Sequence, residues 1–173
     1  FAGASATSNY LTSQNAGEES TLKLPVASWK DPYKAKSQGG GGAKYCAKPF
    51  MLSISDIYPS YDSDELPGAD SNFLASGFSG SLAGLNVSTE VDKIWTSEGL
   101  GGTKYFVGQS GGTKDGAPTA KSVSGFSSIR GLAPEEPTKE GSYYSAGVAR
   151  WARITDVNAV QGNQKIQTFV VAM

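Results

Sequence analysis

Two short apolar runs, at residues 50–54 and 166–172, most constrain the fold of this chain. The first follows Pro49, is too short for a convincing helix and stops at turn-forming residues, so it predicts a buried strand. The second is rich in β-branched and aromatic residues, which suits a buried position in a sheet. We therefore expect residues 50–55 and 166–171 to be buried, parallel strands of one sheet.

Two amphipathic helices are predicted between these strands, at residues 85–98 and from Ser142 to about Ile154. In both segments apolar residues recur with the spacing of one helix face. The residues on the two stripes are Val87, Val91, Ile94, Trp95, Tyr144, Val148, Trp151 and Ala152. We expect their aromatic members to be core residues rather than a binding platform. Asn86 or Ser88 could cap the first helix, and Ser142 the second.

A short strand is predicted at residues 104–107, followed by a long loop that covers residues 109–141. The elements then alternate as strand, helix, strand, helix, strand. This order favours an α/β fold with a mainly parallel sheet, right-handed crossovers and helices over its faces. Three strands make a small sheet, so strands from outside this sequence would be needed to complete it.

The chain divides into an irregular N-terminal segment, residues 1–44, and an α/β segment, residues 45–173. Four consecutive glycines at 39–42 are expected to form a flexible linker or a loop tip. The sequence begins at Phe1 and ends in an apolar run. We therefore expect it to be a fragment of a longer chain.

The composition excludes several classes of function. Without histidine the chain lacks the commonest general base and the Ser-His-Asp and Cys-His arrangements. Its single cysteine, Cys46, is expected to be a small buried hydrophobe, although it could pair outside this segment. The 15 basic and 16 acidic residues are interspersed, so we expect no nucleic-acid partner. No apolar run approaches the roughly 18 residues of a membrane span, so no membrane insertion is expected.

An acidic segment follows the first strand and is the candidate metal site. Asp56 ends the strand, and the loop after it contains Asp62, Asp64, Glu65 and Asp70. Ligands gather at the carboxyl ends of strands in open α/β sheets, and Ca²⁺ and Mg²⁺ prefer oxygen ligands. We predict that Asp56, Asp62 and Asp64 bind such an ion. The alternative is that Asp62 and Asp64 are solvated turn residues that bond to nearby backbone amides.

Asp56 is expected to be the most constrained carboxylate of the chain. A carboxylate directly after a buried strand must be paired, hydrogen-bonded or bound to a metal, because its desolvation is otherwise costly. Asp31, Asp92 and Asp115 lie in segments that are expected to be exposed. Replacing any of them should therefore matter less than replacing Asp56.

Several segments resemble the PilY/PilC-type tip adhesins of bacterial type IV pili. The matching segments are LPVASWKDPY at 24–33, CAKPFM at 46–51, SDIYPSYDSD at 55–64, GLAPEEPT at 131–138, GVARWARITD at 147–156 and QKIQTF at 164–169. The resemblance extends over nearly the whole chain from about Thr21.

The resemblance implies part of a von Willebrand factor A-like domain, whose sheet is doubly wound and whose adhesive function can use a divalent ion. It also implies an extracellular location at the cell surface or pilus tip, with pilus assembly and retraction as further roles. The expected partners are pilus subunits such as minor pilins, host or mineral surfaces, and the rest of a longer chain. In such domains the metal site combines an Asp-x-Ser-x-Ser motif with an aspartate that ends a central strand. Asp56 matches that aspartate, but the motif does not occur in this sequence.

Three functions remain open at this stage. The first is a non-enzymatic extracellular adhesin segment that binds surfaces or pilus components. The second is a structural subunit or fragment of an extracellular filament, which low charge, many glycines and apolar ends would favour. The third is a hydrolase with paired carboxylates, such as Asp62 with Asp64 or Glu135 with Glu136. Acids so close together in a loop have no defined separation, which makes the third function the weakest.

Overall fold

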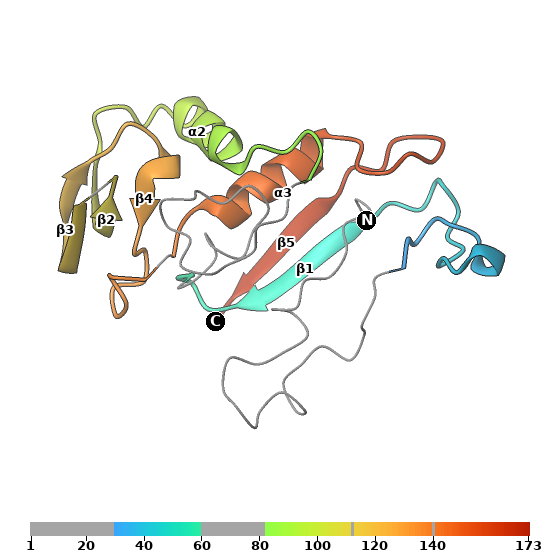
Figure 1. The fold of residues 1–173 in the computed structure, drawn as a ribbon, viewed down its shortest axis with the longest axis horizontal. Helices are drawn as coiled ribbons and strands as arrows, with labels where there is room; N and C mark the ends of the chain where they lie inside the picture. The colour runs from blue at the N-terminus through green and yellow to red at the C-terminus, as the bar shows by residue number, and fades with distance from the viewer. Residues whose placement is uncertain (1–29, 60–81, 112, 140) are drawn as a thin grey trace, which may run out of the picture.

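The computed structural model describes residues 30–59, 82–111, 113–139 and 141–173 (Figure 1). Two helices lie between a parallel and an antiparallel sheet, with short 3₁₀ turns in the connections. In chain order the elements are η2 (Lys36–Gln38), β1 (Phe50–Ser55), α2 (Val87–Ser97), β2 (Lys104–Ser110), β3 (Thr113–Ser122), η3 (Phe126–Ser128), β4 (Ile129–Arg130), α3 (Tyr144–Ile154) and β5 (Gln167–Ala172).

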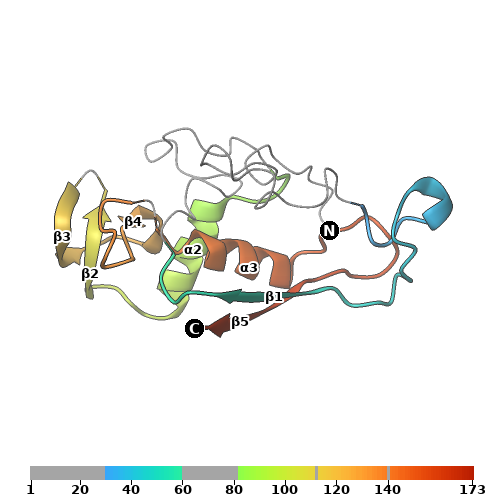
Figure 2. The same ribbon diagram turned by 90° about the horizontal axis from the view of Figure 1, so that it is seen from below.

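The parallel sheet consists of β1 and β5, which pair from Phe50 opposite Gln167 to Ser55 opposite Ala172. The predicted strands and their parallel direction are confirmed. The prediction that they are buried is wrong, because almost every residue of both strands is exposed. Figure 2 shows the reason: the described helices lie on one side of this sheet, and no described element covers the other side.

The middle strand does not join that sheet. It extends to Ser110 as β2 and lies between β3 and β4 in a separate antiparallel sheet. The predicted single parallel sheet and the predicted loop at 109–141 are therefore wrong, since that segment contains β3, η3 and β4. The glycines and Pro118 suggested a loop, but β3 is an edge strand, where proline is tolerated.

Gly108 explains the irregularity of β2. The pairing register shifts between Val107 and Gln109, which places Gly108 at a bulge. A Cβ atom at Gly108 would lie 2.0 Å from the carbonyl oxygen of Pro137. Only glycine therefore lets the segment that follows β4 pass this close to β2.

Both predicted helices are confirmed, at Val87–Ser97 and Tyr144–Ile154. The Asn86 side chain accepts a hydrogen bond from the Thr89 amide at 2.8 Å, so Asn86 is the cap of α2. Tyr143 occupies the N-cap position of α3, but the Ser142 hydroxyl accepts from the Tyr144 amide at 3.1 Å. Ser142 therefore satisfies one of the first free amides of that helix.

The main core lies between α2, α3 and the antiparallel sheet. Its buried members are Val87, Val91, Val107, Phe126, Ile129 and Tyr144, with Trp95 and Val148 packed against them. A second cluster of Trp151, Ala152, Val157 and Ile166 lies between α3 and the segment that leads into β5. The predicted core role of the helix aromatics is confirmed. Trp151 also donates its indole N–H to the carbonyl of Gly84 at 2.9 Å.

The four glycines at 39–42 form an ordered turn, so of the two expectations, a flexible linker or a loop tip, the flexible linker is wrong. Gly41 donates to the carbonyl of Asp31 at 2.8 Å and Gly42 to that of Lys34 at 2.9 Å. Gly39 and Gly42 have φ values of 80° and 73°, which favour glycine. A Cβ atom at Gly40 would lie 2.1 Å from the Lys34 carbonyl oxygen. Cys46, in the turn just after this segment, is exposed, so its predicted burial is wrong.

The two helices approach each other closely at Gly147 of α3. A Cβ atom there would lie 2.7 Å from Val91 Cγ1 and 3.0 Å from the Val87 carbonyl oxygen. We expect Gly147→Ala to lower the free energy of unfolding by about 1–3 kcal/mol through overpacking. Chemical denaturation would measure this loss. We expect this net loss of stability even though the higher helix propensity of alanine favours the variant by about 1 kcal/mol.

Ala146→Gly is the matched control, because Ala146 is the exposed neighbour on the same helix. It should cost only the lost helix propensity, about 1 kcal/mol. A Gly147→Ala variant more stable than its parent would contradict the close helix contact.

Candidate functional site

Asp56, the central residue of the predicted metal site, is exposed at the end of β1. Its Oδ1 atom accepts a hydrogen bond from the amide of Ile57 at 2.6 Å, which is a local turn contact. Asp62 and Asp64 lie outside the described residues. Among the residues that are described, no three His, Cys, Asp or Glu side chains come together around a common point. Binding of Ca²⁺ or Mg²⁺ by Asp56, Asp62 and Asp64 therefore stays a prediction.

Asp92 is a more tightly held carboxylate, although its segment was expected to be exposed. Its Oδ1 accepts from the amide of Ser127 at 2.9 Å, and its Oδ2 accepts from the hydroxyl of the same residue at 2.7 Å. A Cβ atom at Gly125 would lie 2.3 Å from Asp92 Oδ1, so glycine leaves room for the carboxylate. Asp92 thus ties α2 to η3 and the antiparallel sheet. No sequence pattern links two residues that far apart.

Asp31 is likewise half-buried rather than exposed. It accepts from the Tyr33 amide at 2.9 Å and from the Asn158 side-chain amide at 3.3 Å. The hydrogen bond from the Tyr33 backbone, helped by that from Asn158, holds the pKa of Asp31 below its usual value. Asp31 therefore joins the glycine turn to the loop that precedes β5. The side chain of Asp115, the third aspartate expected to be exposed, is not among those described.

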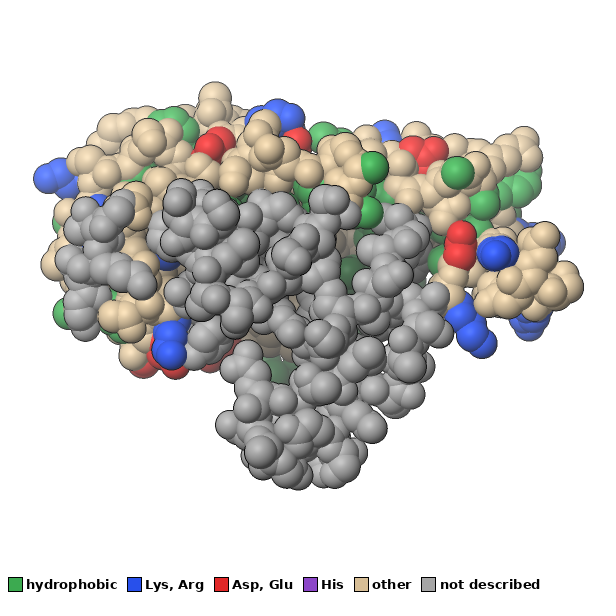
Figure 3. All heavy atoms as spheres, viewed as in Figure 1, with side chains coloured by type: hydrophobic (Ala, Val, Ile, Leu, Met, Phe, Trp, Pro, Cys, Tyr) green, Lys and Arg blue, Asp and Glu red, His purple; other side chains and the backbone are tan. Residues whose placement is uncertain are grey.

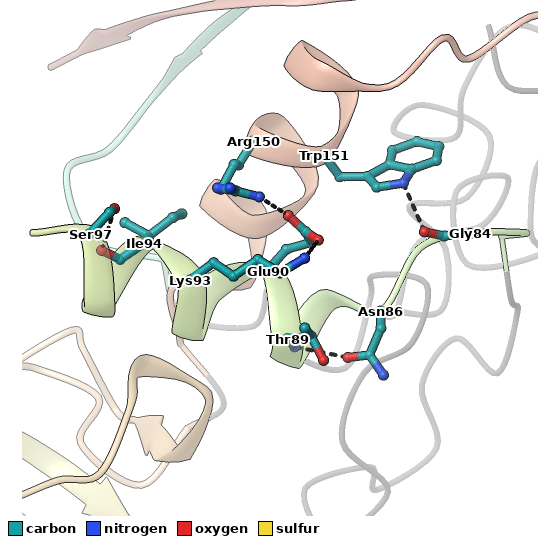
Figure 4. Close-up of polar contacts among 9 residues, drawn as sticks. All are labelled: Gly84, Asn86, Thr89, Glu90, Lys93, Ile94, Ser97, Arg150 and Trp151. Atoms are coloured by element: carbon teal, nitrogen blue, oxygen red, sulfur yellow. Dashed lines mark hydrogen bonds and ion pairs between the residues drawn. The ribbon is translucent and has the colours of Figure 1, made fainter.

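Glu90 is the buried acid between the two helices (Figure 4). It accepts hydrogen bonds from Lys93 Nζ at 2.7 Å, one turn along α2, and from Arg150 of α3. Burial raises the pKa of Glu90, but the hydrogen bonds from Lys93 and Arg150 outweigh it and hold the pKa below the ordinary value. The i,i+3 spacing of Glu90 and Lys93 is visible in the sequence, whereas the partner on α3 is not.

A shallow hollow of about 500 Å³ opens beside this ion cluster. It is lined by Thr89, Asp92, Lys93, Thr96, Ser97 and Arg150. All three of its charged side chains already have partners inside the protein: Asp92 bonds to Ser127, and Lys93 and Arg150 both bond to Glu90. The hydroxyl groups of Thr89, Thr96 and Ser97 can hydrogen-bond a small polar molecule. The hollow holds no histidine or cysteine that could serve as a nucleophile or base.

The most unusual surface is the outer face of the β1–β5 sheet. Side chains alternate along each strand, and paired residues share a face. Gln167 shares the outer face with five apolar residues, which are Phe50, Leu52, Ile54, Phe169 and Val171. Their exposed fractions range from 48% for Val171 to 66% for Phe50. The half-buried Ser53 and Thr168 belong to the opposite face, toward α3, where Met51 and Val170 are still 51% and 66% exposed.

This sheet also has open edges. Within the described chain β1 and β5 pair only with each other, so each keeps an edge with unpaired backbone groups. Parallel sheets are normally covered on both faces, and large exposed apolar patches mark interaction sites. We call the outer face and its two edges the β1–β5 surface. It is the strongest candidate for a functional surface in the described chain.

Comparison with known proteins identifies the family. Residues 1–152 match the family model described as PilY1 homolog, second domain. The chain is also 45% identical over 176 residues to a type IV pilus biogenesis factor PilY1 homolog of Xylella fastidiosa strain Temecula1. This chain belongs to the PilY1-homolog second-domain family. The alignment covers 100% of this chain and 12% of that relative.

Membership of the PilY1-homolog family confirms the resemblance as far as a relation to type IV pilus biogenesis factors. No solved structure matches the chain, so the fold rests on the structure described above. The von Willebrand A-like architecture stays a prediction for this second domain. None of its described helices is long and apolar enough to cross a membrane.

Asp92 and Asp56 provide a direct test of which carboxylate matters for stability. Asp92→Ala leaves the amide and hydroxyl of Ser127 without their acceptor, so we expect a loss of about 1–3 kcal/mol in the free energy of unfolding. Asp56→Ala without added metal should change it by less than about 0.5 kcal/mol, because the side chain is exposed. Urea denaturation of both variants gives the comparison. Equal losses of unfolding free energy in the two variants would show that the Asp92–Ser127 contact does not stabilise the fold.

Glu90 should make stability depend on acid pH. A carboxylate with a lowered folded-state pKa stabilises the fold above its unfolded pKa, and this contribution is lost as the pH falls. We expect the loss to begin near pH 4.5, the ordinary value for Glu90, and to grow below it. Since Lys93 and Arg150 are partly exposed, the contribution should be about 1 kcal/mol.

The measurement is thermal unfolding of the parent and of Glu90→Gln between about pH 3 and pH 7. The variant should be less stable at neutral pH and should lose less stability toward acid pH. Parallel curves for the two proteins would rule out the assigned role of Glu90.

Proposed function

We propose that this chain is a non-enzymatic, extracellular domain of a type IV pilus tip protein, and that it serves in pilus assembly and adhesion. The β1–β5 surface is the observation that carries the proposal. It offers apolar side chains and open strand edges for docking, whereas the buried charged side chains Glu90, Lys121 and Arg130 bond to other groups of the described protein. The name of the relative, type IV pilus biogenesis factor PilY1 homolog, supports both the pilus context and a role in biogenesis.

The occupant that we propose for the β1–β5 surface is another part of the same longer polypeptide. The chain spans 12% of the length of its relative, which leaves ample further sequence to supply strands and a covering helix. A parallel strand next to β1 or β5 would satisfy an open edge, and an amphipathic helix would cover Phe50, Leu52 and Phe169. Such an arrangement would give the doubly wound, von Willebrand A-like sheet that the sequence resemblance implies. Pilus subunits such as minor pilins, and host or mineral surfaces, are the proposed external partners.

A second occupant is a copy of the same chain, as in a filament subunit. The open edges of β1 and β5 would favour this arrangement, because exposed strand edges add to neighbouring sheets. Self-association distinguishes the two: a filament subunit polymerises alone, whereas a domain that docks within its own polypeptide does not.

The test substitutes the outer face and compares two lengths of polypeptide. Leu52→Ser with Phe169→Ser removes two exposed apolar side chains, so we expect a loss below about 1 kcal/mol in the 173-residue chain. In the longer polypeptide, where these side chains are covered, the loss should rise to about 3 kcal/mol or more. Phe106→Ser, on the antiparallel sheet and 72% exposed, is the control and should behave alike in both lengths.

Hydrogen exchange adds a readout that does not depend on substitution. Amides on the open edges of β1 and β5 should exchange at least about tenfold more slowly in the longer polypeptide. Equal exchange and equal losses in the two lengths would overturn docking within the chain. Concentration-dependent oligomers that protect the same amides would instead support the filament subunit.

A further inference from the structure

Residues 30–48 form a basic projection at one end of the molecule, which we call the lysine loop. Its five lysines are all exposed, and Asp31 is its one acid. The lysines are Lys30, Lys34, Lys36, Lys44 and Lys48. The loop therefore has a net charge of +4 within a chain of net charge −1. The loop is thus a local concentration of positive charge, and the remaining residues of the chain are acidic on balance.

The lysine loop has a fixed backbone. The glycine turn folds it back on itself, and the Ala43 amide donates to the Pro32 carbonyl at 2.8 Å. The Tyr33 hydroxyl donates to the carbonyl of Ala47 at 2.8 Å and closes the base of the loop. Asp31 anchors it to Asn158. The single acid of the loop is therefore hydrogen-bonded within the protein. Because the backbone that carries the lysines is already ordered, binding a partner would not pay the entropic cost of ordering it.

The lysines are available to a partner. None of the five forms an ion pair or side-chain hydrogen bond with a described residue in this structure. Figure 3 shows Lys and Arg side chains gathered around this end of the molecule, at the right of the view. Tyr45, between Lys44 and Cys46, is 53% exposed, and its carbonyl is held by the Gln164 side chain at 2.9 Å. The loop thus combines fixed positive charges with one exposed aromatic ring.

We propose that the lysine loop binds an anionic polysaccharide, a chain of sugar rings with repeated carboxylate or sulfate groups. This inference rests on the adhesive part of the proposed function and gives that function a class of ligand. Lysine is a compact, strongly hydrated point charge, suited to spaced anionic groups rather than to bidentate recognition of a single one. The Tyr45 ring offers an apolar face against which a sugar ring can pack.

The same loop is poorly suited to a lipid surface or a nucleic acid. Interfacial membrane binding needs large apolar side chains to insert beside the charges, and Tyr45 is the only large apolar residue exposed in the loop. The loop contains no arginine, the residue that most often reads bases and pairs with phosphate through two bonds. A polysaccharide therefore fits the observed residues better.

The test titrates the intact protein with polygalacturonate, which carries a carboxylate on each sugar. We expect saturable binding at about 50 mM salt that is lost at about 300 mM, where exposed charges are screened. Lys34→Gln with Lys44→Gln should weaken binding about 25-fold, because each lysine near an anionic surface contributes about a fivefold gain. Fully methyl-esterified polygalacturonate, which has no charge, should not bind.

Lys104→Gln with Arg153→Gln is the matched control, since it removes two exposed positive charges outside the loop. It should weaken binding by less than about threefold. An equal loss in the control pair, or equal binding of the esterified polymer, would overturn the lysine loop as the site. Tighter binding to duplex DNA or to phosphatidylserine vesicles at the same salt concentration would overturn the polysaccharide as the ligand.

The result can be separated from the test of docking. Leu52→Ser with Phe169→Ser changes the β1–β5 surface and should leave polygalacturonate binding within about twofold of the parent. Loss of docking with retained polysaccharide binding would therefore count against the docking proposal alone. Retained docking with no polysaccharide binding would count against the lysine loop alone.

Discussion

The close contact of α2 and α3 at Gly147 is the constraint on which the rest of the structure depends. Because Gly147 has no side chain, the two helix backbones approach closely, and Val87 and Val91 of α2 are buried in the main core beside α3. Hydrogen bonds from the helix pair also reach the region of each sheet. Asp92 of α2 binds Ser127 beside the antiparallel sheet, and the carbonyl of Ala152 in α3 accepts from Ile166 at 2.8 Å, just before β5. The two sheets are therefore positioned through the helix pair rather than through each other.

This arrangement separates the parts that maintain the fold from the parts offered to partners. The ionisable groups near the helix pair are engaged internally, as Glu90 shows with Lys93 and Arg150. The groups offered to partners lie elsewhere. The β1–β5 surface carries exposed apolar side chains, and the lysine loop carries exposed lysines. A domain built this way can meet two different partners without disturbing its core. Such a division suits a component of a larger pilus protein.

The sequence predicted well what local spacing determines. Both helices, the Asn86 cap, the outer strands and their parallel pairing follow from apolar periodicity and turn residues. The prediction failed where distant contacts decide the structure: Pro118 and nearby glycines suggested a loop, but that segment pairs with β2 and forms β3. The burial of β1 and β5 was overestimated because apolar content does not show what covers a strand. Asp92 was underestimated for the same reason, since its partner Ser127 is remote in sequence, while Asp62 and Asp64 lie outside the described residues.

The pairing of β1 with β5 has a consequence for how the domain forms. Phe50 pairs with Gln167, so the parallel sheet joins the first and last strands of the described chain, and both helices and the other sheet lie between them in the sequence. Closing so long a loop carries an entropic cost before any contact rewards it, and pairings of this kind fold slowly. During synthesis β1 emerges well before its partner exists. Until β5 has been made, β1 is an unpaired apolar strand and is therefore open to pairing with other chains.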